Sequence, residues 1–349
     1  MEKVLLGMSG GVDSSVSAIL LKEAGYEVYG VTMQLFEGGC CNLDSYLDAK
    51  LVCKQIGIEH YILDYRKEFK KNVIDDFICE YSNCRTPNPC IECNKYLKFG
   101  AMYEKAKELG IDYIATGHYA KIEYSEEYGK NVLRKSKNTA KDQSYVLYNI
   151  PKELLDKVIF PLGDFESKAE IREIAKKHNL KVASKPDSED ICFIPDGNYK
   201  KFLEENSGLK PKEGNIVNRN GEVLGKHRGL YNYTIGQRKG LGISYKTPLF
   251  VLGFDISKNE VIVGEEHELY QKEALVDNIN LLLVDELTEP MEVKVKTRYS
   301  TKEADATIEK VDDECIKVIF DKPQARITPG QSAVFYSGDI ILGGGKIKC

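Results

Sequence analysis

The stretch Lys3-Val4-Leu5-Leu6-Gly7-Met8-Ser9-Gly10-Gly11-Val12-Asp13-Ser14 begins with an apolar run whose length is typical of a buried strand. The residues that follow have the apolar spacing of a helix, which Gly25 ends. A strand that enters a helix through a Gly-rich turn points successive N–H groups at one spot, and the helix N-terminus adds roughly half a positive charge. The stretch therefore predicts a phosphate-binding loop with Ser9 and Ser14 as hydroxyl donors, although an ordinary turn is the simpler alternative.

This loop differs from the two common nucleotide motifs, because it has neither Gly-Lys-Ser/Thr nor Gly-x-Gly-x-x-Gly. It resembles the PP-loop of the ATP pyrophosphatases, which split ATP between the α and β phosphates. A carboxylate repels bare phosphate, so Asp13 is expected to orient Mg²⁺ or to cap the turn. The resemblance implies that ATP and Mg²⁺ bind here. The expected nucleotide-binding residues are Gly7, Met8, Ser9, Gly10, Gly11, Val12, Asp13, Ser14, Met33 and Gly117.

The composition is that of an ordinary globular protein, with 349 residues, 42% of them hydrophobic and 30% charged. No apolar run approaches the roughly 18–20 residues of a membrane span. Residues 1–3 lead directly into the first strand, so we expect no signal peptide and a cytoplasmic location. A net charge of −5 neither indicates nor excludes nucleic-acid binding. Ten cysteines under reducing conditions favour thiol or metal chemistry over a disulfide framework.

Strands and helices alternate along the first 204 residues, among them a predicted helix at 66–82 and another that a capping box at Ser167 and Glu170 should open. This alternation predicts an α/β fold with a parallel sheet covered by helices on both faces. The PP-loop resemblance makes this part a Rossmann-like domain of the HUP type. From about residue 205, Gly-rich turns and short alternating runs predict β-rich structure. We therefore expect an ATP-binding catalytic domain at 1–204, a small central β-rich domain at 205–272 and a β-barrel at 273–349.

Two cysteine sites stand out from the rest of the chain. Cys90-Ile91-Glu92-Cys93 follows Thr86-Pro87-Asn88-Pro89, whose two prolines predict an extended approach. Cys93 is expected to open the helix at 96–109, where a helix N-terminus stabilises a thiolate. Cys192 follows a polar, loop-like stretch at 184–190. A small buried apolar side chain is the simpler interpretation of a single cysteine, but a Cys-x-x-Cys after two prolines favours a chemical role. Cys192 taken alone is most simply interpreted as a thiol at the edge of a strand.

Six motifs occur in order and together resemble the tRNA-specific 2-thiouridylases over essentially the whole chain. They are Ser9–Ser14, the Thr-Pro-Asn-Pro-x-x-x-Cys-Asn-Lys segment at 86–95, Ala115–Tyr119, Lys141–Tyr145, Asp190–Ile194 and Tyr233–Gly240. The resemblance implies that ATP adenylates the C2 oxygen of the wobble uridine. The cysteine that matches Cys192 then carries a persulfide sulfur to C2. The cysteine that matches Cys93 attacks the persulfide, frees the thiolated base and leaves a disulfide.

Cys90 departs from the commoner pattern, since many relatives have Asp at this position. The departure puts the persulfide route in doubt, because three thiolates resemble the ligands of a 4Fe-4S cluster with one open iron site. Cys90, Cys93 and Cys192 are therefore candidate cluster ligands, and both routes stay open. Cys84 is a candidate for a supporting role. The remaining cysteines are expected to be buried or idle thiols: Cys40, Cys41, Cys53, Cys79, Cys315 and Cys349.

The resemblance also implies an RNA interface formed partly by the β-rich parts, so that the central domain binds tRNA. A local basic and aromatic patch at 226–240 supports this interpretation, since basic groups bind phosphate and aromatic rings stack on flipped bases. His118 has two interpretations, RNA phosphate contact or the capping of a turn. The residues expected to touch tRNA are His118, Lys141, Asp142, Gln143, Ser144, Arg298, Tyr299 and Gln331.

The leading hypothesis is an ATP-dependent tRNA sulfurtransferase that acts on the anticodon. Its sulfur donor would be a cysteine desulfurase, a relay protein or free sulfide. One alternative is a PP-loop ligase acting on a small metabolite, which would need the Ser9–Ser14 loop but not the cysteines. A second alternative is a metal-binding RNA adaptor, which would need the cysteines but not an intact phosphate loop.

Overall fold

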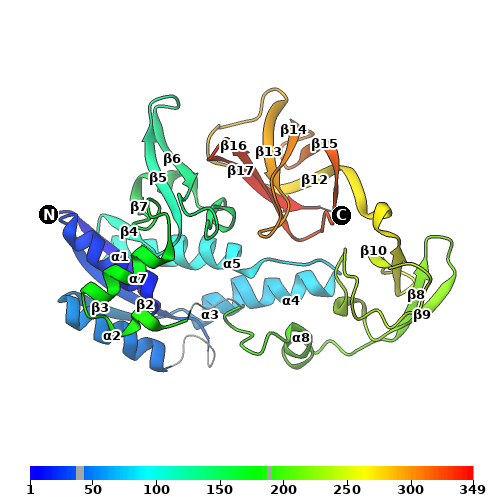
Figure 1. The fold of residues 1–349 in the computed structure, drawn as a ribbon, viewed down its shortest axis with the longest axis horizontal. Coiled ribbons are helices and arrows are strands. Elements are labelled where there is room, and N and C mark those ends of the chain that lie inside the picture. The colour runs from blue at the N-terminus through cyan, green and yellow to red at the C-terminus, as the bar shows by residue number, and fades with distance from the viewer. Residues whose placement is uncertain (37–42, 187–190, 349) are drawn as a thin grey trace.

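The computed structural model describes residues 1–36, 43–186 and 191–348, with three β-structured parts (Figure 1). The parallel sheet with its helices and the small sheet near residues 214–264 lie at opposite ends of the long axis. A barrel formed by the last part of the chain lies above the helices that connect them. Cys40, Cys41, Cys349 and Asp190 lie outside the described residues.

The amino-terminal sheet has five parallel strands in the order β3-β2-β1-β4-β7. Leu5 packs into one buried cluster, whereas Val4 and Leu6 pack into another, so both faces of β1 are covered. This is the expected parallel sheet with helices on both sides. Its strands are β1 (Lys3–Gly7), β2 (Glu27–Gln34), β3 (Glu59–Asp64), β4 (Tyr113–Ala115) and β7 (Val158–Ile159).

The sequence predicts two of the helical segments correctly. Ser167 accepts a hydrogen bond from the Glu170 backbone, and the Glu170 side chain accepts one from the Ser167 backbone, so the expected capping box is confirmed. The helical stretch at 66–82 is also confirmed, with a π-helical segment (Lys70–Ile74) in its middle. The α-helices are α1 (Val12–Glu23), α2 (Leu43–Ile56), α3 (Arg66–Phe69), α4 (Asp75–Ser82), α5 (Pro89–Glu92), α6 (Met102–Glu108), α7 (Lys168–Lys177) and α8 (Tyr199–Ser207). No helix in the described ranges is long and apolar enough to cross a membrane.

Beyond α8 the chain is β-rich, as the sequence predicts. A four-stranded sheet in the order β10-β11-β8-β9 has a small apolar core of its own. Six later strands form a barrel, because β12 pairs with β15 on one side and with β17 on the other. The strands are β8 (Gly214–Asn218), β9 (Val223–His227), β10 (Phe250–Asp255), β11 (Glu260–Gly264), β12 (Tyr270–Leu281), β13 (Met291–Lys296), β14 (Ala304–Lys310), β15 (Ile316–Ala325), β16 (Ser332–Ser337) and β17 (Ile340–Ile347).

One hairpin of the amino-terminal part belongs to the sheet of the barrel. Strands β5 (Ala120–Ser125) and β6 (Lys130–Lys135) pair with each other, and β6 continues onto β17. Figure 1 shows this hairpin standing beside the barrel. Arg134 bonds the Asp339 carboxylate at 2.7 Å, which fixes the junction. The sequence analysis did not anticipate this connection, because the two strands are about 200 residues apart.

Candidate active site

The Ser9–Ser14 loop connects β1 to α1 at the carboxyl end of the parallel sheet. Gly11 is the N-cap of α1, and as a glycine it has no side chain to occupy the N–H groups of the first turn. Gly10 has a φ of +72°, and a Cβ at this position would lie 2.4 Å from the carbonyl oxygen of Ser45. Only glycine therefore fits at position 10, and the first turn of α1 can receive an anion.

The hydroxyl groups of the loop gather at its mouth. Ser14 Oγ accepts a hydrogen bond from the Ser9 backbone N–H at 3.2 Å and lies 3.2 Å from Ser9 Oγ. Ser14 Oγ also donates to the Gly11 carbonyl oxygen. The loop is therefore a compact unit with hydroxyls and N–H groups together, which fits the phosphates of ATP.

Asp13 is held by two side chains that the sequence analysis did not single out as site residues. Tyr119 donates its hydroxyl proton to Asp13 Oδ1 at 2.8 Å, and Lys168 Nζ lies 2.6 Å from Oδ2. Lys185 lies at the same loop, 3.1 Å from the Gly10 carbonyl oxygen and 2.7 Å from Asp48 Oδ2. A lysine in the first turn of a helix opposes the helix dipole, so the position of Lys168 was a usable signal of another role.

Two further residues of the expected nucleotide site lie at the ends of neighbouring strands. A Cβ at Gly117 would lie 2.9 Å from the backbone nitrogen of Ser14, so this glycine permits close approach to the loop itself. The sequence analysis had assigned that approach to the nucleotide. Met33 is partly buried and packs against the two apolar clusters that meet at the end of β2.

The helix that carries the cysteine pair begins earlier than expected. Asn88 is its N-cap and accepts a hydrogen bond from the Cys90 N–H at 3.2 Å, and Pro89 is the first helical residue. The expectation of an extended approach up to Cys93 is therefore wrong from Pro89 onward, because proline is favoured at the first position of a helix. The thiol at the helix N-terminus is that of Cys90, and Cys93 begins a π-helical segment (Cys93–Ala101).

Cys93 and Cys192 belong to the same cluster of packed side chains. Cys93 is 8% exposed within this cluster, and Cys192 is partly buried against it. Three phenylalanines line the cluster. The ring centroid of Phe193 lies 5.6 Å from that of Phe69 and 5.4 Å from that of Phe77. Two cysteines that are 99 positions apart in the sequence are thus brought into one apolar environment.

The described residues do not form a ready-made metal site. They contain no group of three or more His, Cys, Asp or Glu side chains placed to hold a metal ion. Cys90 is exposed, whereas Cys93 is buried in the aromatic cluster. This arrangement of Cys90, Cys93 and Cys192 does not fit an iron–sulfur cluster as it stands, so we derive no step through one, and the cluster stays a prediction.

The barrel contacts the cysteine segment directly. Gln331 donates from Nε2 to the Thr86 carbonyl oxygen at 2.7 Å, and the Thr86 N–H donates to the Pro329 carbonyl oxygen at 2.9 Å. Gly330 has a φ of +87°, and a Cβ there would lie 2.9 Å from the Thr86 nitrogen. The predicted site residue Gln331 therefore binds the chain just before the double proline.

Lys346, near the end of β17, lies among three carboxylates on this segment. Its Nζ is 3.7 Å from Asp76 and Glu80 and 3.8 Å from Glu92, the residue before Cys93. Burial alone would lower the pKa of Lys346, but the three carboxylates outweigh it and raise that pKa. Burial likewise raises the pKa of Glu92. This cluster of Lys346, Asp76, Glu80 and Glu92 joins the barrel to α4 and α5.

The polar side chains of the predicted tRNA segment Lys141–Ser144 make most of their contacts within the amino-terminal part of the chain. Asp142 Oδ1 accepts from the Ser136 N–H at 2.9 Å and Oδ2 accepts from the Ser144 hydroxyl at 2.6 Å. Burial raises the pKa of the Asp142 carboxyl. Gln143 Oε1 accepts from the Tyr119 N–H at 2.9 Å. Asp142, Gln143 and Ser144 therefore shape the loop, whereas Lys141 is half-buried.

His118 is buried, with both ring nitrogens engaged. Nδ1 lies 2.7 Å from Thr116 Oγ1, and Nε2 lies 3.3 Å from Lys98 Nζ. Burial, reinforced by Lys98, holds the pKa of His118 well below its usual value, so the ring is neutral at pH 7. These contacts hold the ring between Thr116 and Lys98, and both interpretations of His118 stay predictions.

Arg298 and Tyr299 follow β13 and connect the barrel to two other segments of the chain. Tyr299 is 44% exposed, its hydroxyl donates to the Asp142 carbonyl oxygen at 3.1 Å, and Lys296 Nζ lies 5.7 Å from its ring centroid. Burial first, then the negative charge of Asp142, raises the pKa of Tyr299, and the charge of Lys141 opposes the shift. Arg298 donates to the Ile235 carbonyl oxygen at 3.0 Å and joins the barrel to the 233–240 loop.

The aromatic patch at 226–240 is less accessible than expected. Tyr231 is only 6% exposed and donates its hydroxyl proton to Glu204 at 2.9 Å, so its ring cannot stack on a base. Tyr233 is half-buried against His227. Only Lys226, Arg228, Arg238 and Lys239 are left as the basic groups of this patch.

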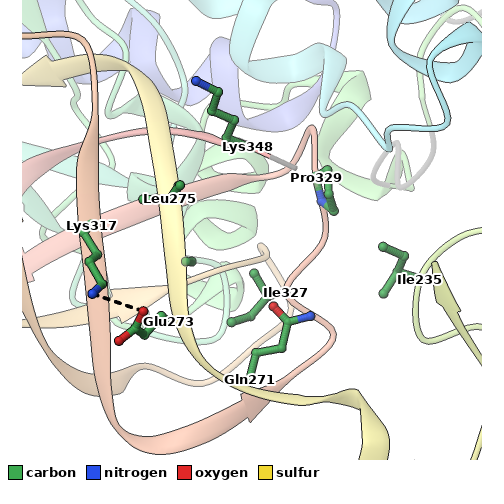
Figure 2. A pocket seen from close by; sticks show the side chains of 9 residues that line it. Ile235, Gln271, Glu273, Leu275, Lys317, Ile327, Pro329 and Lys348 are labelled. Carbon is green, nitrogen blue, oxygen red and sulfur yellow. Dashed lines mark ion pairs between the residues drawn. The ribbon is translucent and has the colours of Figure 1, made fainter. Parts of the chain in front are cut away.

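A surface pocket lies where the 233–240 loop meets the barrel (Figure 2). In Figure 2, Ile235 faces strands β12 and β15 across the pocket, and the Glu273–Lys317 ion pair of 3.1 Å lies on the opposite wall. Apart from Ile235, which lies in the 226–240 patch, the residues that line the pocket are not among those expected to bind ATP, sulfur or tRNA. The phosphate loop and the thiols therefore define the candidate active site.

Family models cover almost the whole chain. Residues 2–196 match a model described as tRNA methyl transferase HUP domain, residues 200–265 match tRNA methyl transferase PRC-barrel domain, and residues 271–347 match Aminomethyltransferase beta-barrel domain. Among solved structures, a 4-thiouridine synthetase–RNA complex with bound ATP covers 58% of this chain and 50% of that chain, with 19% identity and a TM-score of 0.40, which is too remote to support an argument.

Curated relatives match from end to end. The tRNA-specific 2-thiouridylase MnmA of Acetivibrio thermocellus is 50% identical over 357 residues, which is 99% of each chain. The relative of the same name from Clostridium acetobutylicum is 52% identical over 356 residues, again 99% of each chain. The one from Clostridioides difficile is 48% identical and covers 99% of this chain and 98% of its own. With this identity over essentially the whole length, the chain belongs to the family of tRNA-specific 2-thiouridylases.

Proposed function

We propose that this protein uses ATP to replace the C2 oxygen of the wobble uridine of tRNA with sulfur. The observation that carries the proposal is the position of the thiols relative to the phosphate loop. The cluster that holds Cys93 and Cys192 includes Leu35, which directly follows β2, and β2 is the neighbour of the strand that ends in the loop. This neighbourhood supports a position of both reactive parts at the carboxyl edge of one parallel sheet, where ligands of this architecture bind.

In the first step the uridine C2 oxygen forms a bond to the α-phosphorus of ATP. The bond from the α-phosphorus to the bridging oxygen breaks, pyrophosphate leaves with the electron pair, and the N3 proton is released. The Ser9–Ser14 loop binds the phosphates through its N–H groups and hydroxyls. Asp13 is the oxygen ligand that would hold Mg²⁺, which would offset the phosphate charge.

In the second step a persulfide on Cys192 attacks C2, and AMP leaves with the oxygen. The Cys93 thiolate then attacks Sγ of Cys192, so that the sulfur stays on the base and a Cys93–Cys192 disulfide forms. The transferred sulfur is reduced while the two thiols are oxidised, and a thiol reductant must restore them. The shared apolar cluster supports this pairing, because it contains Cys93 and Cys192 packs against it.

We propose that Lys141, Tyr299 and Arg298 lie along the tRNA path, because Tyr299 is exposed and its hydroxyl donates to the carbonyl oxygen of Asp142, next to Lys141. The remaining predicted tRNA residues, His118, Asp142, Gln143, Ser144 and Gln331, would act by holding this surface in place. The sulfur donor would be a cysteine desulfurase, a relay protein or free sulfide. A cytoplasmic location agrees with such a substrate and with reduced thiols.

The test is a single-turnover assay with unmodified tRNA, ATP and a persulfide donor, read out as 2-thiouridine in the RNA digest. Cys192→Ser should give no product and no protein–RNA adduct. Cys93→Ser should trap tRNA on Cys192 through a disulfide that a reductant releases. Cys79→Ser, which changes an exposed thiol of α4, is the matched control and should retain full activity. Normal product from Cys93→Ser would contradict the proposed pairing.

Cys90 distinguishes the two sulfur routes. Under the persulfide route, Cys90→Asp should retain activity, because the thiol pair is intact. Under a cluster route the same change should abolish activity together with the iron content of anaerobically purified protein. Iron-free wild-type protein that thiolates tRNA fully would exclude the cluster route.

A further inference from the structure

We propose that Lys168 and Lys185 bind the leaving pyrophosphate, and that Asp13 and Asp48 hold them beside the phosphate loop until nucleotide arrives. This inference rests on the proposed ATP-dependent function and adds two residues from outside the loop. Lys168 Nζ lies 2.6 Å from Asp13 Oδ2, inside the loop sequence itself. Lys185 Nζ lies 3.1 Å from the Gly10 carbonyl oxygen and 2.7 Å from Asp48 Oδ2.

Helix α7 fixes both lysines in place. Lys168 is its first residue, immediately after the capping residue Ser167. Arg172, one turn later, donates to the carbonyl oxygens of Ala183 at 2.7 Å and Lys185 at 3.1 Å. Ile171 of α7 is fully buried in the cluster that also contains α1. Helix α7 therefore carries Lys168 and binds the backbone of Lys185, and it packs against the helix that follows the phosphate loop.

The charges around the loop indicate what the lysines are for. The two positive charges of the lysines cancel the two negative charges of Asp13 and Asp48. The main uncompensated charge at the loop is then the roughly half positive charge of the α1 dipole. Pyrophosphate gains an electron pair when the bond to the α-phosphorus breaks, and half a charge cannot balance it. The two ammonium groups can balance this negative charge if each one exchanges its carboxylate partner for a phosphate oxygen.

Partial exposure makes this exchange feasible. The side chain of Lys168 is 15% exposed and that of Asp13 30%, while Lys185 and Asp48 are both 34% exposed. Neither pair is sealed in the core, so a phosphate oxygen can reach the ammonium group without unfolding of α7. Release of Lys168 would also free Asp13 to serve as the metal ligand suggested by its position in the loop.

Binding measurements on the full-length protein test the inference without tRNA or sulfur. Calorimetry with Mg²⁺ present should show that Lys168→Met and Lys185→Met each weaken pyrophosphate and ATP binding by roughly tenfold to 100-fold. AMP, which lacks the β and γ phosphates, should bind the variants as it binds the wild type. Lys294→Met, which removes an exposed lysine paired with Asp305 on the barrel, should change none of the three affinities.

Two further variants keep the inference testable if a methionine variant folds poorly. Lys168→Arg keeps the charge and should retain most of the pyrophosphate affinity. Asp48→Asn removes the carboxylate that competes for Lys185 and should tighten pyrophosphate binding. Unchanged pyrophosphate affinity in the methionine variants, or an equal loss of AMP affinity, would overturn the inference while leaving ATP use intact. Failure of the wild-type protein to bind ATP at all would overturn the proposed function as well.

Discussion

Replacing Lys346 with methionine should uncouple the barrel from the cysteine segment. Methionine preserves the length and packing of the side chain but removes its charge from among three carboxylates. Asp76, Glu80 and Glu92 would then repel one another at the base of the helix that carries Cys90. We expect the variant to lose thiolation activity while it still binds ATP, because the phosphate loop does not contact this cluster.

The magnitude follows from the geometry. The Nζ of Lys346 lies 3.7–3.8 Å from the three carboxylates, and the side chains of Glu80 and Glu92 are only 10% and 14% exposed. Removing one partner of a buried ion pair typically costs about 3–5 kcal/mol. The distances are longer than ideal hydrogen bonds and Asp76 is 31% exposed, so we expect about 3 kcal/mol, at the low end of that range. A loss of this size should lower Tm by roughly 5 °C or more.

The assay combines scanning calorimetry with single-turnover thiolation. Lys294→Met is the matched control, because Lys294 also lies on a barrel strand but pairs with Asp305 on the surface, where the loss should be within about 0.5 kcal/mol. Adding Glu92→Gln to Lys346→Met should restore part of the stability, since one unpaired charge is removed. Equal Tm values for the Lys346 and Lys294 variants, with normal thiolation in both, would refute the reasoning.

Three other changes have defined outcomes. Gly10→Ala should abolish ATP binding, measured by equilibrium dialysis, because a Cβ at this position (φ +72°) has no room. Gly25→Ala is the control: Gly25 also has a positive φ, +90°, but a Cβ there meets open space, so ATP affinity should not change. His118→Gln should make Tm fall less steeply as the pH drops below about 6.5. Burial lowers the pKa of His118, so the unfolded chain binds this proton at a higher pH than the folded protein does, which costs the folded state up to about 1.4 kcal/mol of stability per pH unit. An unchanged slope of Tm against pH would contradict this. Gln331→Ala removes the 2.7 Å bond to Thr86 and should slow thiolation roughly fivefold, as measured by product formed per turnover.

The sequence predicted those structural features that depend on interactions between residues close together in the chain. The phosphate loop, the capping box at Ser167 and the alternating strands of the barrel all depend on neighbours within a few residues. The helix start at Pro89 was missed because two local rules compete there. Proline disfavours a helix before it but is favoured at the first helical position, and only the Asn88 cap decides between them.

The remaining features depend on contacts between distant segments, which one sequence does not show. Lys168 reaches Asp13 across 155 positions, and Gln331 reaches Thr86 across 245. The close approach of Gly117 to the loop likewise needs the sheet order β1-β4 before it can be recognised. Hydrophobic periodicity identifies elements, but it does not specify which polar side chains meet once those elements pack.

The pairing of β6 with β17 has a consequence for how the chain is made. Synthesis delivers β6 early, whereas β17 follows about 200 residues later, and it also closes the barrel against β12. Until then the outer edge of the hairpin has unpaired backbone groups, which is a hazard for misassembly in a nascent chain. Translation that stops before Ile340 should therefore leave an aggregation-prone polypeptide in which neither the barrel nor the hairpin has its final neighbour.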